Sequence, residues 1–490
     1  MNDRDSLVCD RAAGHPLGGL ADPAGGLGTE RAEQTAQRLW RRMTLVAAPH
    51  GTPRPRPMAV PAELHAALAL FEASAQGSAT GGHSAPSAGA LQPYELRVVT
   101  GGPDGPRVFS VDVARRTCYL THEGEEVDKA LCDGGLALPG PDTSLVLLVV
   151  RPWLSIRKYD ERGYLYAQLD TAHLGTHLLC LAAAGHRRAQ WLTGAATGPL
   201  NTLLGLGDDY LLPHSVLLLD GPAGHRPPEP GAWSCTDHRD TRRSPRRPEH
   251  FEYRCWQQLA EFRHEGPTAS SGTPPLSLLD GTEAAAPPQP AQLARLARLA
   301  AVRRSAKDFG PGPVPADALR RALAAMSTPL PTDLPPADGF GATLVARRVD
   351  GLAPGAYRVL RAGTEDAAPR GRVTSSDDDL VRICMGQEHL RHTAAAVVFH
   401  GRREQVFRHG MAGIDHALLR AGALAHLLYL GATDADVAIT TIGGFDAAAW
   451  HRLAGLTDQD EVLYVAMLGP RGAAARKTDR LQGAYAHGGR

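Results

Sequence analysis

Two arginines and a serine stand side by side at Arg303, Arg304 and Ser305, directly after a predicted helical stretch. Guanidinium groups match phosphate oxygens with paired hydrogen bonds, and a serine hydroxyl adds one more donor. The segment is therefore a candidate site for a phosphate or another compact anion. The alternative is a solvated basic helix end, and these three residues alone do not decide between the two.

A second candidate is the segment APSAGALQPYEL, which precedes a predicted strand at residues 97–99. Small residues beside a proline allow the backbone to approach a flat ligand closely. An ordinary loop before a strand has a similar composition, so the motif alone leaves both interpretations open. The positions of interest are Pro86, Ser87, Gly89 and Leu91.

A metal site has weaker support in the sequence. Cysteine and histidine occur near one another at Cys235, His238, Cys255 and His264, but with a single Cys-x-x-His pair. Structural zinc sites show paired, regular spacing, so we expect no metal. The arginines between residues 239 and 247 are interpreted as part of a solvated linker, with contact to an acidic leader peptide as the alternative.

Length and composition limit the classes of function. The 490 residues fit two domains of common size. Lys+Arg and Asp+Glu each total 52, so the balanced charge gives no reason to expect nucleic acid or a membrane as the partner. The seven cysteines form no CxxC pair, and neither a signal segment nor a membrane-spanning apolar run is present, which predicts a cytoplasmic protein.

The chain divides into two blocks that repeat one another. His177 in THLLCLAA and His426 in AHLLYLGA lie 249 residues apart (426 − 177), and the terminal strands HSVLLLDG and VLYVAMLG keep the same offset. Such a constant offset indicates duplication and fusion. We predict a disordered tail at 1–30, a first domain at 31–221, a linker with a short helix at 222–290, a second domain at 291–472 and a C-terminal tail at 473–490.

Each block mixes helices with short strands. The second block predicts helices at 317–326 and 414–430 and strands at 344–349, 357–360 and 462–468, and the first block predicts a buried strand at 145–150. We therefore expect an α+β fold in which helices wrap a largely antiparallel sheet.

Three of these motifs together resemble the nitroreductase superfamily: RRSxKxF at Arg303–Phe309, PSAGALxPxEL at Pro86–Leu96, and GGF at Gly443–Phe445 before a terminal strand. The chain also resembles the azoline-oxidising branch of that superfamily, of the streptolysin-S and microcin-B type. That branch carries a Lys-Tyr pair followed by Arg-Gly-Tyr, here Lys158-Tyr159 and Arg162-Gly163-Tyr164. The resemblance covers both blocks but neither the tails nor the linker.

The resemblance implies two fused nitroreductase-like domains that form a pseudo-dimer within the chain, with FMN between them. It implies that Lys158 and Tyr159 are the catalytic pair. The cofactor-binding residues that it implies are Arg303, Arg304, Ser305, Lys307, Gly443, Gly444 and Arg471 from the second block, and Pro86, Ser87, Gly89 and Leu91 from the first.

The two blocks differ in which motifs they keep. The Lys-Tyr pair aligns with Phe407 and Arg408, and the PSAGAL loop aligns with residues 335–340, so the second block has lost both. The first block lacks a clean arginine-serine motif and has Thr193-Gly194-Ala195 where the second has GGF. We predict one working FMN site per chain and a degenerate reciprocal site. The alternative is that both blocks have simply diverged.

The predicted function is FMN-dependent oxidation of azoline rings to azoles, such as thiazoline to thiazole, on a ribosomally synthesised peptide. A cyclodehydratase is the partner implied upstream. Lys158 serves as the base only if burial lowers its pKa, and Tyr159 relays the proton or holds the ring. Two alternatives remain: a general flavin reductase of nitro compounds or quinones that uses NAD(P)H, and a flavin-free scaffold of a peptide-modifying complex.

Overall fold

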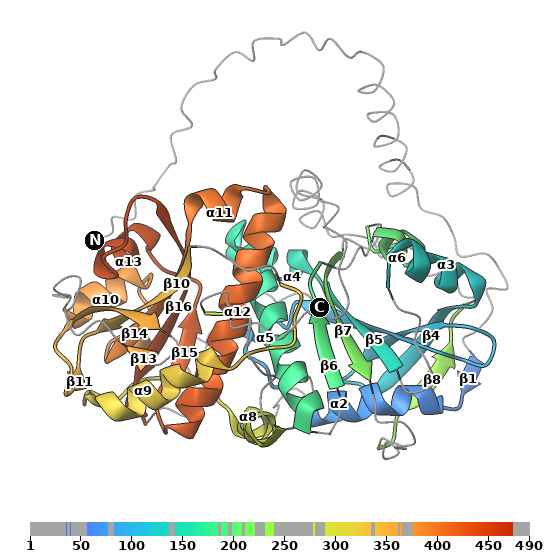
Figure 1. Ribbon diagram of the computed structural model, residues 1–490, viewed down its shortest axis with the longest axis horizontal. Coiled ribbons are helices and arrows are strands. Elements are labelled where there is room, and N and C mark those ends of the chain that lie inside the picture. The colour runs from blue at the N-terminus through green and yellow to red at the C-terminus, as the bar shows by residue number, and fades with distance from the viewer. Residues whose placement is uncertain are drawn as a thin grey trace, which may run out of the picture. The chain divides into compact units, whose positions relative to one another are not determined.

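The structure is a computed structural model of the full chain (Figure 1). The chain forms two compact units, Met1–Thr52 and Pro53–Arg490. Only residues 36 and 40 of the first unit are described, and every element discussed below lies in the second. The described residues are 56–76, 83–136, 143–184, 188–194, 198–207, 211–220, 231–239, 278–279, 290–334, 339–360, 363–364 and 376–473. The predicted tail at 1–30, residues 474–490 of the predicted C-terminal tail, the short helix predicted within the linker (residues 250–264), Cys255 and His264 lie outside them.

The first half is built on an eight-stranded sheet with the order β1-β8-β4-β3-β2-β5-β7-β6. All neighbouring pairs are antiparallel except β4 and β8, which are parallel. The strands are β1 (Arg56–Met58), β2 (Tyr94–Thr100), β3 (Arg107–Asp112), β4 (Thr117–Glu123), β5 (Thr143–Val150), β6 (Arg188–Leu192), β7 (Leu212–Asp220) and β8 (Ser234–Asp237).

Strand β8 departs from the sequence prediction, because it lies inside the stretch that we predicted to be linker. It pairs with both β1 and β4, so the linker returns to the first sheet and extends it. Cys235 is buried in this strand, and Cys118 is its register partner on β4. The position of Cys235 is therefore explained by packing in the sheet.

The second half is built on a six-stranded antiparallel sheet with the order β13-β12-β10-β14-β16-β15. The strand predicted at 344–349 is in fact two, because β10 ends at Ala346 and Val349 starts β11, which pairs with β9. The strands of the six-stranded sheet are β10 (Phe340–Ala346), β12 (Gly355–Leu360), β13 (Gly363–Thr364), β14 (Ala395–Arg402), β15 (Ala438–Ile442) and β16 (Asp460–Gly469). Strands β9 (Val314–Pro315) and β11 (Val349–Asp350) form a separate two-stranded sheet.

The two sheets confirm the repeat. The order β3-β2-β5-β7-β6 in the first half corresponds strand for strand to β12-β10-β14-β16-β15 in the second, with the same antiparallel pairing throughout. A long helix follows the central strand in each half, α5 (Arg162–Ala184) after β5 and α12 (Met411–Asp434) after β14. The two halves therefore share one topology, as the constant offset predicted.

Helices α5 and α12 pack against one another and join the halves (Figure 1). They approach closely at Gly422, where an added Cβ would lie 2.7 Å from the Cβ of Ala172 and 2.9 Å from the carbonyl oxygen of Leu169. The remaining helices are α2 (His65–Ala75), α3 (Glu125–Asp133), α4 (Pro152–Tyr159), α6 (Gly198–Leu203), α8 (Pro290–Val302), α9 (Ala316–Ala324), α10 (Asp377–Ile383), α11 (Arg403–Phe407) and α13 (Ala447–Leu453).

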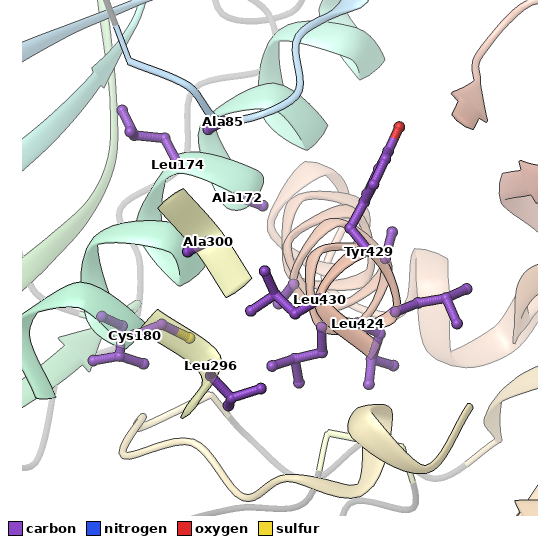
Figure 2. Close-up of a cluster of buried hydrophobic side chains, with 14 of the residues drawn as sticks. Ala85, Ala172, Leu174, Cys180, Leu296, Ala300, Leu424, Tyr429 and Leu430 are labelled. Carbon is purple, nitrogen blue, oxygen red and sulfur yellow. The ribbon is translucent and has the colours of Figure 1, made fainter. Parts of the chain in front are cut away.

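Helix α8 opens the second half but packs on the first. Figure 2 shows Leu296 and Ala300 of α8 among buried side chains of α5 and α12. Burying a leucine in this way contributes about 1.5–3 kcal/mol. Because α8 ends at Val302, this packing delivers the residues that follow it to the boundary between the halves.

Three histidines are fully buried where α5 meets α12: His173, His177 and His426. The ring centroid of His426 lies 5.6 Å from that of His173 and 5.3 Å from that of His177. Neither ring nitrogen of His426 has a hydrogen-bond partner among the described residues. Burial lowers the pKa of His173 and of His177 to about 3, and it also lowers the pKa of His426.

We expect acid to destabilise the chain through this cluster. The unfolded histidines bind protons below their ordinary pKa of 6.5, whereas the folded ones do not until the pH is far lower. Their contribution to stability is therefore complete above pH 6.5 and is lost as the pH falls from there towards 3, by about 1.4 kcal/mol per pH unit for each histidine. Urea unfolding between pH 7.5 and 5 measures the slope.

Two variants test whether the buried histidine cluster causes the pH dependence of the free energy of unfolding. His426→Leu removes a buried titrating group and should flatten the pH dependence of the free energy of unfolding. His409→Leu, at an exposed position, should leave it unchanged. If both variants kept the full slope, another group would be responsible.

Candidate active site

The small-residue loop of the first half is held by a carboxylate on α5. The hydroxyl of Ser87 donates to Asp170 at 2.7 Å, and the amide of Ala88 donates to both oxygens of the same carboxylate at 2.9 and 3.0 Å. Gly89 follows with a φ of 61°, which a glycine adopts at little cost. At Gly89 the surface of the loop is therefore formed by backbone atoms and few side-chain atoms.

Lys158 and Tyr159 lie against this loop, in the last turn of α4. A Cβ added to Gly89 would lie 2.7 Å from the Nζ of Lys158 and 2.6 Å from the hydroxyl of Tyr159. The pair therefore stands at the end of a helix and faces the loop. The loop and the Lys-Tyr pair, more than sixty residues apart in the sequence, form one surface.

The α5 helix connects this surface to the GGF segment of the second half. The Tyr159 ring packs edge-on against Tyr166, with 4.8 Å between centroids. Arg162, one turn before Tyr166, donates to the carbonyl oxygen of Gly443 at 2.8 Å and stacks over the ring of Phe445 at 4.9 Å. Tyr164 of the Arg-Gly-Tyr motif instead donates to Asp415 on α12 at 2.8 Å, so that part of the motif joins the two long helices.

The contact between Gly443 and Tyr166 leaves no room for a side chain, which gives a test of the site's packing. A Cβ on Gly443 would lie 1.9 Å from the ring of Tyr166, whereas a Cβ on Gly444 would meet nothing closer than 3.4 Å. We expect Gly443→Ala to lower the free energy of unfolding by about 1–3 kcal/mol, as overpacking does. The matched control Gly444→Ala should change it little, and equal melting temperatures for the two variants would contradict the packing described.

Arg303 brings the arginine-serine motif to the first half. Its guanidinium donates to the carbonyl oxygen of Ser84, two residues before the PSAGAL loop, and stacks on the Tyr429 ring at 5.1 Å. The hydroxyl of Ser305 lies 3.2 Å from both a guanidinium nitrogen of Arg303 and the hydroxyl of Tyr429. The arginine-serine motif of the second half and the segment that leads into the PSAGAL loop of the first half are therefore adjacent.

Among the described residues, the guanidinium of Arg303 has no counter-ion. Only 5% of the residue is exposed, and no carboxylate among the described residues pairs with it. Its Nε also has no hydrogen-bond partner there. Burial lowers its pKa to about 10, so it still carries its charge at neutral pH. A buried charge is normally paired, so this position is suited to an anionic ligand.

The other predicted cofactor residues of the second half flank Arg303. Arg304 is exposed and donates to the carbonyl oxygen of Arg303 at 2.7 Å. Lys307 lies in the segment whose Phe309 forms a β-bridge with Arg471. The side chain of Arg471 lies at the surface, 3.0 Å from Asp436. The bridge brings the backbone of Phe309 and that of Arg471 together, whereas the side chain of Arg471 pairs with Asp436.

The residues present fit a flat group with a phosphate. Within the described ranges, the buried Arg303 has no carboxylate partner and the hydroxyl of the buried Tyr94 has no hydrogen-bond partner. The Gly89 loop offers a close backbone surface. Sequence reasoning missed Tyr94, Tyr166 and Asp170. The spacing of Arg162, Tyr166 and Asp170 by four residues, one helical face, was the available signal.

On the reciprocal side, several described residues bind other parts of the chain. Thr193 and Gly194, the counterparts of the GGF segment, donate their amides to the carboxylate of Asp333 at 2.5 and 3.2 Å. The buried Arg420 of α12 donates to the carbonyl oxygen of Leu278, from the predicted linker. Phe407, the counterpart of Lys158, is 49% exposed. Among the described residues, the second half therefore has no counterpart of the Lys-Tyr pair, whose aligned positions are Phe407 and Arg408.

Two classes of site have no support in the part of the chain that is described. No group of three or more histidine, cysteine or acidic side chains there is arranged to hold a metal ion. Likewise, none of the helices in the described ranges combines the length and apolar character that crossing a bilayer requires.

Comparison with known proteins agrees with this architecture. Residues 300–470 match the model of the nitroreductase family. A protein of Anabaena variabilis provisionally named a nitroreductase aligns over 88% of this chain and 95% of its own, with a TM-score of 0.59 and 19% identity. The chain thus has a fold of two nitroreductase-like domains. No curated protein matches it in sequence.

Further solved structures match only part of the chain. The microcin synthetase McbBCD complex of Escherichia coli, with truncated pro-MccB17 bound, aligns over 35% of this chain and 69% of its own, with a TM-score of 0.28 and 15% identity. The NADPH:FMN oxidoreductase of Vibrio harveyi aligns over 36% of this chain and 70% of its own, with a TM-score of 0.24 and 16% identity.

Proposed function

We propose that the chain is an FMN-dependent oxidoreductase that oxidises azoline rings to azoles on a ribosomally synthesised peptide. One observation carries the proposal: the buried Arg303 of the second half, which has no carboxylate partner among the described residues, and the Lys158-Tyr159 surface of the first half contact one short segment, at Ser84 and at Gly89. Each half contributes what the other lacks.

In this proposal the FMN phosphate is held by Arg303, Ser305 and their neighbours Arg304 and Lys307, whereas the side chain of Arg471 pairs with Asp436. The backbone of Pro86–Leu91 and of Gly443–Gly444 borders the ring. FMN bound there would supply the hydride acceptor for the reaction. The second half thus supplies the residues that bind the phosphate, and the first half supplies the residues that face the substrate.

The chain's own residues take the proton. Converting an azoline to an azole removes one proton and one hydride from neighbouring ring carbons, so a base must stand beside the substrate. Lys158 Nζ and the Tyr159 hydroxyl both reach the surface of Gly89 and are placed for this role. The ring of Tyr166 packs on Tyr159 and fixes its orientation. Burial raises the pKa of Tyr166, which therefore stays a neutral phenol.

The visible spectrum of the purified protein and its activity on a thiazoline-containing peptide test the proposal. We expect flavin absorbance and the loss of two hydrogen atoms per ring, measured by mass spectrometry, with oxygen as the final acceptor. Oxidation of NAD(P)H with nitro compounds or quinones, in the absence of any peptide effect, would instead identify a general reductase. A colourless protein would identify a scaffold.

We expect one FMN per chain. Among the described residues, the set of contacts at Ser84 and Gly89 occurs once, and on the reciprocal side Thr193 and Gly194 bind Asp333 while Arg420 binds the carbonyl oxygen of Leu278. Denaturing release of flavin, quantified against protein by amino-acid analysis, gives the ratio. A ratio near two would show that the reciprocal position also binds flavin, and would overturn the asymmetric assignment.

A further inference from the structure

Asp170 is a buried acid that the proposed reaction does not use. It lies on α5 with 2% of its surface exposed, and no cationic side chain among the described residues pairs with it. Burial raises its pKa, hydrogen bonds from Ser87 and Ala88 offset part of the rise, and the resulting pKa is about 7. A buried acid without a cation normally needs such donors, so the loop and Asp170 depend on one another.

The loop has an unusual backbone that requires such an anchor. Gly89, Ala90 and Gln92 all have a positive φ, of 61°, 56° and 48°, and the left-handed region is costly for alanine and glutamine. The Ser87 hydroxyl also accepts the amide of Gln92 at 2.8 Å, which closes the loop on itself. The chain of contacts therefore runs from Asp170 through Ser87 to the end of the loop.

The same helix fixes the two other parts of the site. One turn before Asp170, Tyr166 packs on Tyr159, and one turn earlier Arg162 binds the carbonyl oxygen of Gly443. One rigid face of α5 thus places the loop, the catalytic pair and the GGF segment relative to one another.

We propose that Asp170 is a positioning residue that holds the loop Ser87–Gln92 at its distance from Lys158 and Tyr159. This role deepens the proposed function and rests on it, but the loop anchoring itself does not depend on which substrate is oxidised. Asp170 acts through Ser87 and Ala88, not through contact with a substrate.

Hydrogen–deuterium exchange of the flavin-free full chain tests the anchoring without any activity. In Asp170→Ala we expect the amides of Ala88 and Gln92 to exchange about tenfold faster or more. Asp170→Asn keeps an oxygen acceptor and should restore most of the protection. The control is Thr171→Ala, whose buried hydroxyl bonds only the carbonyl oxygen of Ala167 in its own helix, and it should leave the loop unchanged.

Ser87→Ala keeps the test valid if Asp170→Ala does not fold. It removes the hydroxyl that links Asp170 to Gln92 and should also speed exchange at Gln92. Unchanged exchange in a folded Asp170→Ala chain, or in Ser87→Ala, would overturn the anchoring role, whatever reaction the protein catalyses.

Turnover then separates positioning from general stability. On a thiazoline peptide we expect Asp170→Ala to lower kcat about tenfold or more with little change in KM, and Asp170→Asn to recover most of it. If no azoline substrate is oxidised by the wild-type chain, the proposed function fails while the exchange result stands. If Asp170→Ala exchanges faster but keeps its kcat, the positioning role fails.

Discussion

Replacing Lys158 by alanine should lower turnover of a thiazoline peptide by about 10²-fold or more while the flavin remains bound, because a positioned base contributes about 10²–10⁴-fold. Its Nζ is at the Gly89 surface, and Arg303, to which we assign the FMN phosphate, belongs to the other half. The loss should fall on kcat. Steady-state kinetics with the flavin content measured on the same sample gives the answer.

Lys158→Arg distinguishes a base from a charge. Arginine keeps the positive charge but does not release its proton at physiological pH. If Lys158 accepts the proton, the arginine variant should be as impaired as the alanine variant. Full activity in Lys158→Arg would show that only the charge matters, and full activity in Lys158→Ala would remove Lys158 from the mechanism.

Replacing Arg303 by methionine should raise the Kd for FMN by about 10²-fold or more, since hydrogen bonds to charged groups contribute about 1.5–3 kcal/mol each. The flavin-free chain should be no less stable than the wild type. No carboxylate in the described ranges loses a partner, and a buried cation is replaced by an apolar side chain of similar length.

Two measurements are needed for this variant. Fluorescence titration of the flavin-free chain with FMN gives Kd, and urea unfolding gives the stability. The matched control is Arg298→Met, at an exposed position on α8, the helix that ends just before Arg303, and it should affect neither. Normal FMN affinity in Arg303→Met would show that the buried guanidinium does not bind the phosphate. A large loss of stability without FMN would show that Arg303 is structural.

Much of the fold follows from local patterns. The repeat, the α+β class and the long buried helix expected at 414–430 are confirmed, because a constant offset and continuous apolar spacing are strong signals over long segments. Strand β8 was missed because four residues between proline- and arginine-rich stretches carry almost no pattern, and the neighbouring strands β1 and β4 fix them.

The site was predictable only in part. The complementary loss of motifs indicated that Arg303 and the Pro86–Leu91 loop belong together, and the structure places Arg303 at Ser84. The roles of Asp170 and Asp333 could not be read from the sequence. Each carboxylate is paired with a segment more than eighty residues away, and an isolated aspartate in a helix or loop looks the same whether or not it has such a partner.

The crossing of α8 onto α5 has a consequence for how the protein behaves on dilution. In an enzyme assembled from two separate subunits, a site shared across the interface is lost when the subunits dissociate. Here the two contributors are tethered, and a tether keeps its modules at an effective concentration of the order of millimolar. Specific activity should therefore be constant down to nanomolar protein, at which many weakly associated dimers have come apart.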